Sequence, residues 1–222
     1  VAVDPEMLGK VFENLMADHD KKSQGAVYTP RPVVQFMCRE ALVPYLQRKA
    51  DIPENQARIL IDGDDPFIEL AEATSVEHSA EVADAVEEAM TSIQVIDPAV
   101  GSGAFPLGML GEILRLRTYA YVASGNEQPS RETLYGWKVQ AIENSLFGVD
   151  INPTAIELCR LRLWLALLVD ENENSTPRPL PNLEYRTIAA NSLSDFVGGV
   201  EVQNTRGSQT IEMGGFDPAE LI

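Results

Sequence analysis

Apolar residues are distributed along the chain in two kinds of pattern. In six segments they recur at the three-four spacing of amphipathic helices, which predicts helices at residues 4–17, 30–47, 76–90, 105–122, 131–144 and 153–168. Short apolar runs bounded by turn residues predict buried strands at residues 93–96, 145–149 and 183–188. Strands that alternate with helices are typical of a parallel sheet with crossover helices, so we expect an α/β fold.

Capping and turn residues mark the boundaries of these segments. Thr29 precedes Pro30, and we expect its hydroxyl to cap the helix that follows, with the proline in the first turn. The residues that we expect this helix to bury are Val33, Val34, Phe36, Met37, Ala41 and Leu42. We divide the chain into an N-terminal helical segment (1–50), an acidic helical insertion (51–92), an α/β core (93–196) and an irregular C-terminal end (197–222).

Charge is unevenly distributed along the chain. The 17 Lys and Arg residues stand against 34 Asp and Glu residues, which gives a net charge of −17. Twelve acidic residues and one basic residue lie between Asp51 and Met90, whereas residues 17–50 hold six basic and three acidic ones. The overall charge argues against nucleic acid, because DNA binding needs Lys and Arg near phosphates. The basic cluster is either a solvated surface or the edge of a DNA channel.

Composition excludes several classes of protein. A content of 45% hydrophobic and 23% charged residues is typical of a soluble globular protein, and no apolar run reaches the roughly 18 residues that cross a bilayer. Cys38 and Cys159 lie far apart in apolar helical patterns, so we expect no disulfide and a reducing, cytoplasmic location. With only His19 and His78 as histidines, we expect no metal site made of protein ligands alone.

The residues that follow the predicted strands carry the chemical signal, because ligands bind beyond the carboxyl ends of the strands in an open parallel sheet. The first strand runs into Asp97-Pro98-Ala99-Val100-Gly101-Ser102-Gly103-Ala104-Phe105, whose glycines permit positive φ and close approach of the backbone to a ligand. A dinucleotide fingerprint needs a third glycine where Pro106 stands, and an acidic residue about 20 positions further on. Asp150 lies 47 residues beyond Gly103, so NAD is a poor fit.

Three segments resemble the motifs of one enzyme family. Residues 25–30 (Gly-Ala-Val-Tyr-Thr-Pro) resemble its cofactor motif Gly-x-(Phe/Tyr)-Tyr-Thr-Pro, residues 97–105 its glycine-rich motif, and residues 148–153 (Gly-Val-Asp-Ile-Asn-Pro) its acidic ribose motif. Asn191-Ser192-Leu193 followed by Asp195 is a weaker fourth match. Over roughly residues 8–196 the chain thus resembles the S-adenosylmethionine-binding half of bacterial DNA adenine methyltransferases of type I, type IIG and related phage-defence restriction-modification systems.

This resemblance implies a Rossmann-like S-adenosylmethionine-dependent methyltransferase core. The residues that it assigns to the cofactor are Tyr28, Thr29 and Pro30; Asp97, Pro98, Ala99, Gly101, Gly103 and Phe105; Asp150 and Ile151; and Asn191 and Asp195.

The chemistry of the cofactor suggests a role for each group. Asp97 suits its cationic amine, and the two glycines make room for its methionine moiety. Asp150 suits the two ribose hydroxyls. Ile151 can pack on the adenine face while Asn191 or Asp195 bonds the adenine edge, and the Tyr-Thr-Pro segment would close the pocket. Capping of a helix stays open as an alternative role for both Asp150 and Thr29.

The catalytic motif of the family has no counterpart in the sequence. Its tetrapeptide, Asn/Asp/Ser-Pro-Pro-Tyr/Phe/Trp, holds the flipped adenine, and the chain contains no Pro-Pro pair. We therefore assign no catalytic residue. We expect a truncated chain, inactive alone, whose catalytic loop and target-recognition region lie beyond Ile222. DNA is the expected partner of the full-length protein, with specificity or restriction subunits as further candidates. Methylation of RNA or protein, and a non-catalytic scaffold or recognition module, stay open as alternatives.

Overall fold

The computed structural model describes residues 29–168, 181–193, 196–197 and 200–201. Its helices are α3 (Arg31–Lys49), α4 (Glu54–Asp62), α5 (Pro66–Ala73), α6 (Val76–Ser92), α7 (Ala104–Ala123), α8 (Arg131–Asn144) and α9 (Pro153–Leu168). Its strands are β1 (Val95–Asp97), β2 (Leu146–Asp150), β3 (Thr187–Ala189), β4 (Phe196–Val197) and β5 (Val200–Glu201). The helix predicted at residues 4–17 lies outside the described residues. Among the helices that are described, none has the length and apolar character needed to cross a membrane.

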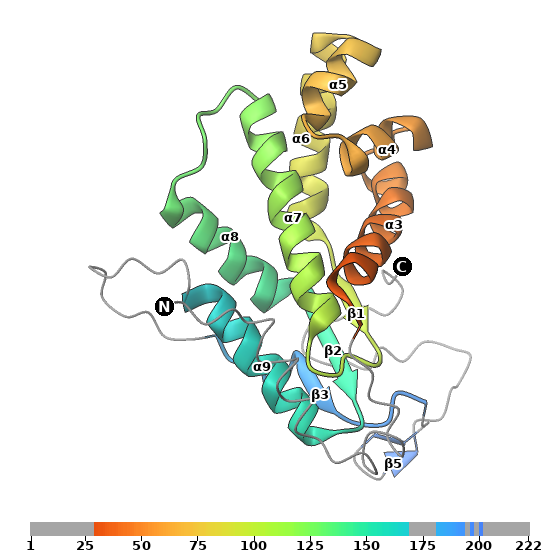
Figure 1. Cartoon of the computed structure of the whole chain (residues 1–222), viewed down its shortest axis with the longest axis vertical. Helices are drawn as coiled ribbons and strands as arrows, with labels where there is room; N and C mark the ends of the chain where they lie inside the picture. Colours follow the sequence, from red (N-terminus) through yellow and green to blue (C-terminus); the bar gives the residue numbers. More distant parts are fainter. Residues whose placement is uncertain (1–28, 169–180, 194–195, 198–199, 202–222) are drawn as a thin grey trace.

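Three strands form a small parallel sheet in the order β1-β2-β3. Val95 of β1 lies opposite Leu146 of β2, and Gly148 of β2 lies opposite Thr187 of β3. Helices α7 and α8 connect β1 to β2, and α9 connects β2 to β3, as parallel pairing requires. The predicted α/β arrangement is therefore confirmed as a parallel sheet whose strands alternate with helices (Figure 1). Strands β4 and β5 form a separate antiparallel pair.

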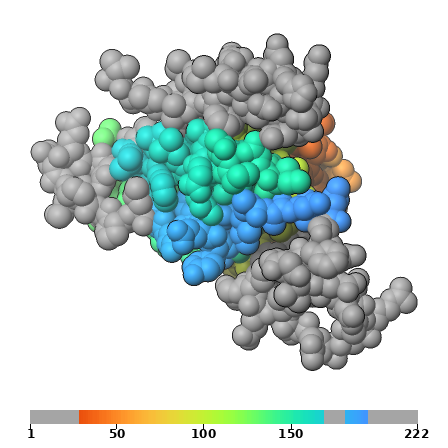
Figure 2. Space-filling view, turned by 90° about the horizontal axis from the view of Figure 1, so that it is seen from below, coloured from red at the N-terminus to blue at the C-terminus, as the bar shows by residue number. Residues whose placement is uncertain are grey.

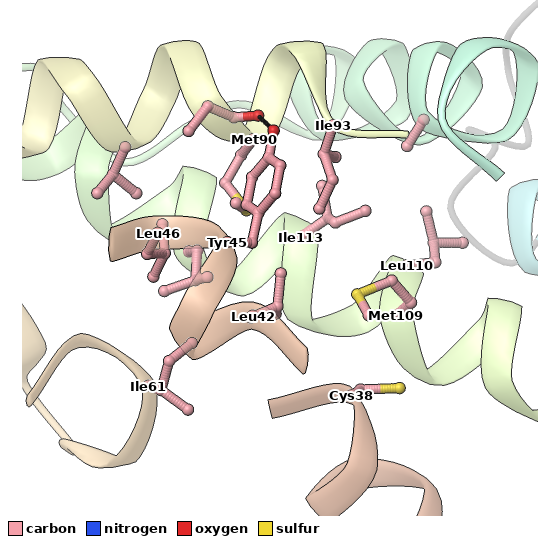
Figure 3. Close-up of a cluster of buried hydrophobic side chains, with 14 of the residues drawn as sticks. Cys38, Leu42, Tyr45, Leu46, Ile61, Met90, Ile93, Met109, Leu110 and Ile113 are labelled. Carbon is pink, nitrogen blue, oxygen red and sulfur yellow. Dashed lines mark hydrogen bonds between the residues drawn. The ribbon is translucent and has the colours of Figure 1, made fainter. Parts of the chain in front are cut away.

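The buried core lies mainly among α3, α6 and α7, which Figure 1 shows above the sheet. Figure 3 shows side chains of these helices meeting in one cluster, where the Tyr45 hydroxyl donates to the carbonyl oxygen of Ala89 at 2.8 Å. The fully buried members of the cluster include Leu42, Leu46, Met90, Ile113 and Leu116. Each such aliphatic side chain stabilises the fold by about 1.5–3 kcal/mol through its burial. This packing fixes α7 against α3, and so fixes the turn that precedes α7.

A buried carboxylate adds polar contacts between the same helices. Glu112 of α7 accepts hydrogen bonds from Gln35 at 3.3 Å and Arg39 at 3.1 Å, both on α3. Its other oxygen accepts from Arg115 at 2.9 Å, and Arg115 also donates to the carbonyl oxygen of Ile61 at the end of α4. Because Glu112 is buried, these bonds stabilise one arrangement of α3, α4 and α7.

Helix α3 differs from its predicted form in two respects. It begins at Arg31 with Pro30 in the cap position and without a side-chain cap, so the predicted Thr29 cap is wrong. Its buried residues are Val34, Cys38, Leu42, Val43, Tyr45 and Leu46. Val33, Phe36 and Met37, which we expected to be buried, are exposed, Phe36 to 63%, and Ala41 is exposed as well. Apolar residues lie on more than one side of this helix, so their spacing could not identify the side that packs.

The third strand is shorter than the predicted strand at residues 183–188. The carbonyl oxygen of Leu183 accepts hydrogen bonds from the N–H groups of Arg186 and Thr187, both at 3.0 Å. The first half of the predicted strand is therefore a turn. Leu183 is nevertheless buried, so its apolar character reflects packing of a turn rather than of a strand. In Figure 2, which views the molecule from below, this segment (blue) lies along the residues that include β2 and α9 (green to cyan).

Candidate functional site

The turns that follow β1 and β2 lie at the lower end of the sheet in Figure 1, and two hydrogen bonds join them. The N–H group of Val100 donates to the carbonyl oxygen of Val149 at 2.9 Å. The N–H group of Gly101 donates to Oδ2 of Asp150 at 2.8 Å. The glycine-rich turn and the acidic residue, which lie 49 positions apart in the sequence, therefore form one site.

Asp150 is held in a fixed orientation but retains room for further bonds. Besides the bond from Gly101 to Oδ2, its Oδ1 accepts the N–H group of Asn152 at 2.8 Å. A carboxylate offers about four acceptor positions, so two remain for hydroxyl donors. The cap of α9 is Asn152, whose Oδ1 accepts the N–H groups of Thr154 at 2.9 Å and Ala155 at 3.3 Å. The alternative in which Asp150 caps this helix is therefore wrong.

Asp97, at the end of β1, has one carboxylate oxygen with a hydrogen-bond donor and one without a donor in the described part of the chain. Its Oδ1 accepts the N–H group of Ala99 at 3.0 Å, whereas Oδ2 is buried and finds no hydrogen-bond donor among the described residues. Burial raises the pKa of this carboxyl above its ordinary value of 3.8; the Ala99 hydrogen bond opposes the shift and the nearby Asp150 adds to it. A buried, unpaired carboxylate oxygen is costly, so a cationic donor at this position would stabilise the site.

The two glycines of the turn are required for different reasons. Gly101 has φ 51°, and a Cβ added there would meet no atom of the described residues within 4 Å. Gly103 has φ 86°, and a Cβ added there would lie 2.7 Å from Sγ of Cys159. Gly101 thus faces open space beside Asp150, where a ligand can approach the backbone, while Gly103 lets α9 pack directly against the turn.

A mainly apolar pocket of about 240 Å³ lies beside Asp97. Pro98 and Phe105, which the resemblance assigns to the cofactor, line it. Met37 and Ala41 of α3 also line it, although we had expected both to be buried in the core. The sequence held one sign that Met37 and Ala41 line the same surface: they lie four positions apart on the helix that follows the Tyr-Thr-Pro segment, and residues at this spacing share one helix face. Cys38, between them, is a buried free thiol whose pKa burial raises to about 12.

The remaining predicted residues lie around this centre with less defined contacts. Ile151 is 66% exposed at the start of the turn after β2. The N–H group of Ala190 donates to the carbonyl oxygen of Asp150 at 2.8 Å, so the chain brings Asn191 to the same sheet end. The side-chain oxygen of Asn191 accepts the N–H group of Leu193 in a local turn. Thr29 and Pro30 immediately precede α3, while Tyr28 and Asp195 lie outside the described residues.

Adjacent strand ends that carry a glycine-rich turn and a carboxylate are typical of α/β proteins that bind adenosine-containing cofactors. Comparison with known proteins agrees with this class. A protein of Methanocaldococcus jannaschii named as a type II restriction enzyme and methyltransferase is 31% identical over an alignment of 204 residues that covers 89% of this chain and 17% of that protein. The adenine-specific methyltransferase PglX of Streptomyces coelicolor is 37% identical over 76 residues, 34% of this chain and 6% of PglX.

These similarities confirm the predicted resemblance: the chain is similar to one protein named as a restriction enzyme and methyltransferase and to another named as an adenine-specific methyltransferase. No protein-family model matches the chain, and no solved structure matches it. The matched part amounts to less than a fifth of the length of either relative.

Proposed function

We propose that this chain is the S-adenosylmethionine-binding part of a DNA methyltransferase that modifies the exocyclic amino group of adenine in a restriction-modification or related defence system. One observation carries the cofactor assignment. The N–H group of Gly101 is hydrogen-bonded to Asp150 close to Asp97, whose buried Oδ2 has no donor among the residues that the structure describes, in a chain similar over 89% of its length to a named methyltransferase.

The residues present fit the chemistry of this cofactor. Asp97 offers a buried anionic oxygen to the ammonium group, which compensates the cost of burying both charges. Asp150 offers its two remaining acceptor positions to the ribose hydroxyls. The open side of Gly101 leaves space for the methionine moiety, and the exposed Ile151 can pack on the adenine ring. When bound, S-adenosylmethionine supplies a methyl group on a positively charged sulfur.

Other predicted residues would complete the pocket. We assign the adenine edge to Asn191 or Asp195 and closure of the pocket to Tyr28, Thr29 and Pro30. A cofactor between the two turns would be enclosed by a Rossmann-like core, of which β1, β2 and β3 with α7 and α9 form a part. Pro106 stands where the dinucleotide fingerprint needs its third glycine, which disfavours a nicotinamide dinucleotide in this pocket.

The choice of adenine in DNA as the target rests on the motif resemblance; the relatives named as a restriction enzyme and methyltransferase and as an adenine-specific methyltransferase support it. The chain contains no Pro-Pro-aromatic sequence to hold a flipped base, so we propose that the 222 residues alone transfer no methyl group. Its net charge of −17 also opposes binding to phosphate, so positively charged regions elsewhere in the protein would supply most of the contact with DNA.

A methyl-transfer assay tests this function. Protein expressed from the complete gene is incubated with tritiated-methyl S-adenosylmethionine and, in parallel, with duplex DNA, RNA and protein acceptors. We expect tritium in N6-methyladenine of the DNA, and none from the 222-residue chain. Tritium in RNA or protein only would contradict the assigned substrate, and a complete protein that binds the cofactor but transfers nothing would favour a scaffold.

A further inference from the structure

Helix α9 contains a buried arginine directly beneath the glycine-rich turn. Arg162 is 2% exposed and belongs to the largest side chains that the described residues bury completely. Burial of a guanidinium group is costly unless its N–H donors are hydrogen-bonded. The groups that accept from Arg162 therefore indicate what this side chain is needed for.

Arg162 holds the middle residue of the turn. Its Nη1 donates to the carbonyl oxygen of Ser102 at 2.7 Å and to the Ser102 hydroxyl at 3.1 Å, and these groups are buried. The residue four positions after Ser102 is Pro106, which has no N–H group to offer to that carbonyl as a helix would. Arg162 thus donates to the buried carbonyl oxygen of Ser102, which receives no helical N–H group from Pro106.

The same face of α9 also supports the next residue of the turn. Cys159 lies three positions before Arg162, and its Sγ occupies the space where a side chain on Gly103 would be. Helix α9 itself begins immediately after the segment that contains Asp150. One helix therefore connects the carboxylate that we assign to the ribose with the turn that we assign to the methionine moiety.

We propose that Arg162 is a positioning residue for the cofactor site, an inference that rests on the proposed function. Arg162 fixes the backbone of Ser102, and so keeps the N–H group of Gly101 directed at Asp150 and the open side of Gly101 directed at the cofactor. It acts through the turn and does not contact the cofactor. Its loss removes none of the groups that we assign to the cofactor, but it lets the positions of these groups relative to one another vary.

Arg117 provides a matched control within the same chain. It is 5% exposed, pairs with Glu87 at 2.8 Å and lies over the ring of Trp137 at 4.5 Å. It stands 14 residues beyond Gly103 on α7, about 21 Å along the helix axis. Removing either arginine disrupts a buried hydrogen-bond network and lowers the stability of the fold. Of the two arginines, Arg162 contacts the glycine-rich turn and Arg117 does not.

The test measures binding of S-adenosylhomocysteine by titration calorimetry to wild type, Arg162→Met, Arg162→Lys and Arg117→Met, each well below its melting temperature. Hydrogen exchange of the peptide covering residues 97–105 is followed in the ligand-free proteins. We expect Arg162→Met to raise Kd roughly tenfold at unchanged stoichiometry, the effect of one charge-assisted hydrogen bond, and to accelerate exchange of this peptide. Arg162→Lys should fall between it and wild type, because one ammonium group still reaches the carbonyl. Arg117→Met should melt at a lower temperature with a Kd within about twofold of wild type.

Two results overturn this inference but leave the proposed function standing. In the first, wild type binds the ligand and both Arg162 variants bind it with a Kd within about twofold of the wild-type value. In the second, Arg117→Met weakens binding as much as Arg162→Met does. If Arg162→Met does not fold, the Kd and the hydrogen-exchange rates of Arg162→Lys are judged by the same criteria. Wild-type protein that binds neither S-adenosylmethionine nor S-adenosylhomocysteine overturns the proposed function, and this inference with it.

Discussion

Replacement of Asp150 by alanine tests the carboxylate at the end of β2. Each carboxylate oxygen accepts one main-chain N–H group at 2.8 Å, and we assign its remaining acceptor positions to the ribose. Hydrogen bonds to a charged group contribute about 1.5–3 kcal/mol. We therefore expect the Kd for S-adenosylhomocysteine to rise roughly 10- to 150-fold in Asp150→Ala.

The same replacement also affects the fold, and the two effects must be separated. It leaves the N–H groups of Gly101 and Asn152 without their acceptor, and both hydrogen bonds are partly buried, so we expect a loss of stability of about 1–3 kcal/mol. A displaced turn would weaken binding of every ligand alike. A lost bond to the ribose weakens only ligands that carry the hydroxyls.

The assay is calorimetric titration with S-adenosylhomocysteine and with its 2′,3′-dideoxy analogue. Wild type should bind the analogue more weakly, whereas Asp150→Ala should bind the two ligands with nearly equal affinity. Asp150→Asn is the matched control, because it retains the shape and one acceptor oxygen but loses the charge, and it should give intermediate discrimination. If Asp150→Ala discriminates between the ligands as strongly as wild type while its melting temperature falls, Asp150 only joins the two turns and its assignment to the ribose is wrong.

Two further predictions concern the turn after β1. Binding of an ammonium group needs Asp97 charged, and burial raises the pKa of Asp97 above 3.8; affinity for S-adenosylhomocysteine should therefore fall as pH drops through this raised pKa, and titrations at several pH values should show a flatter profile for Asp97→Asn. An equally steep profile in Asp97→Asn would assign the titration to another group. Gly103→Ala should lower the free energy of unfolding by about 1–3 kcal/mol, because its Cβ meets Cys159 at 2.7 Å and φ is 86°. Gly101→Ala, whose Cβ meets no atom of the described part of the chain, should lose less stability and more cofactor affinity in denaturation and titration experiments; the reverse order would refute the orientation of the turn.

The sequence predicted the elements that carry strong local signals. The strand before Asp97 and the helix at residues 131–144 were expected within about two residues of where they lie, because apolar runs and capping residues such as Ser130 act locally. The segment around Leu183 was misread, since a buried turn and a buried strand both place an apolar residue inside. The Thr29 cap failed for a related reason: a residue that can cap a helix does so only if the backbone turns at that residue.

The residues of the candidate site could be named from the sequence, but the contacts between them could not be predicted. Asp97, Gly101 and Asp150 were identified from their places after strands, and the structure brings these turns together. No local pattern could show that Gly101 donates to Asp150 or that Arg162 reaches Ser102, because these contacts join residues 49 and 60 positions apart. Arg162 interrupts an apolar helical pattern in the sequence, but its role depends on contacts that only the tertiary fold creates.

Direct binding of the cofactor tests the central claim. Equilibrium titration of the wild-type protein with S-adenosylmethionine, S-adenosylhomocysteine and NAD, under one set of conditions, compares the three ligands. The geometry of Asp97, Gly101 and Asp150 predicts saturable binding of both sulfur-containing ligands at one site per chain, and no binding of NAD. Binding of NAD without binding of either sulfur-containing ligand would contradict it.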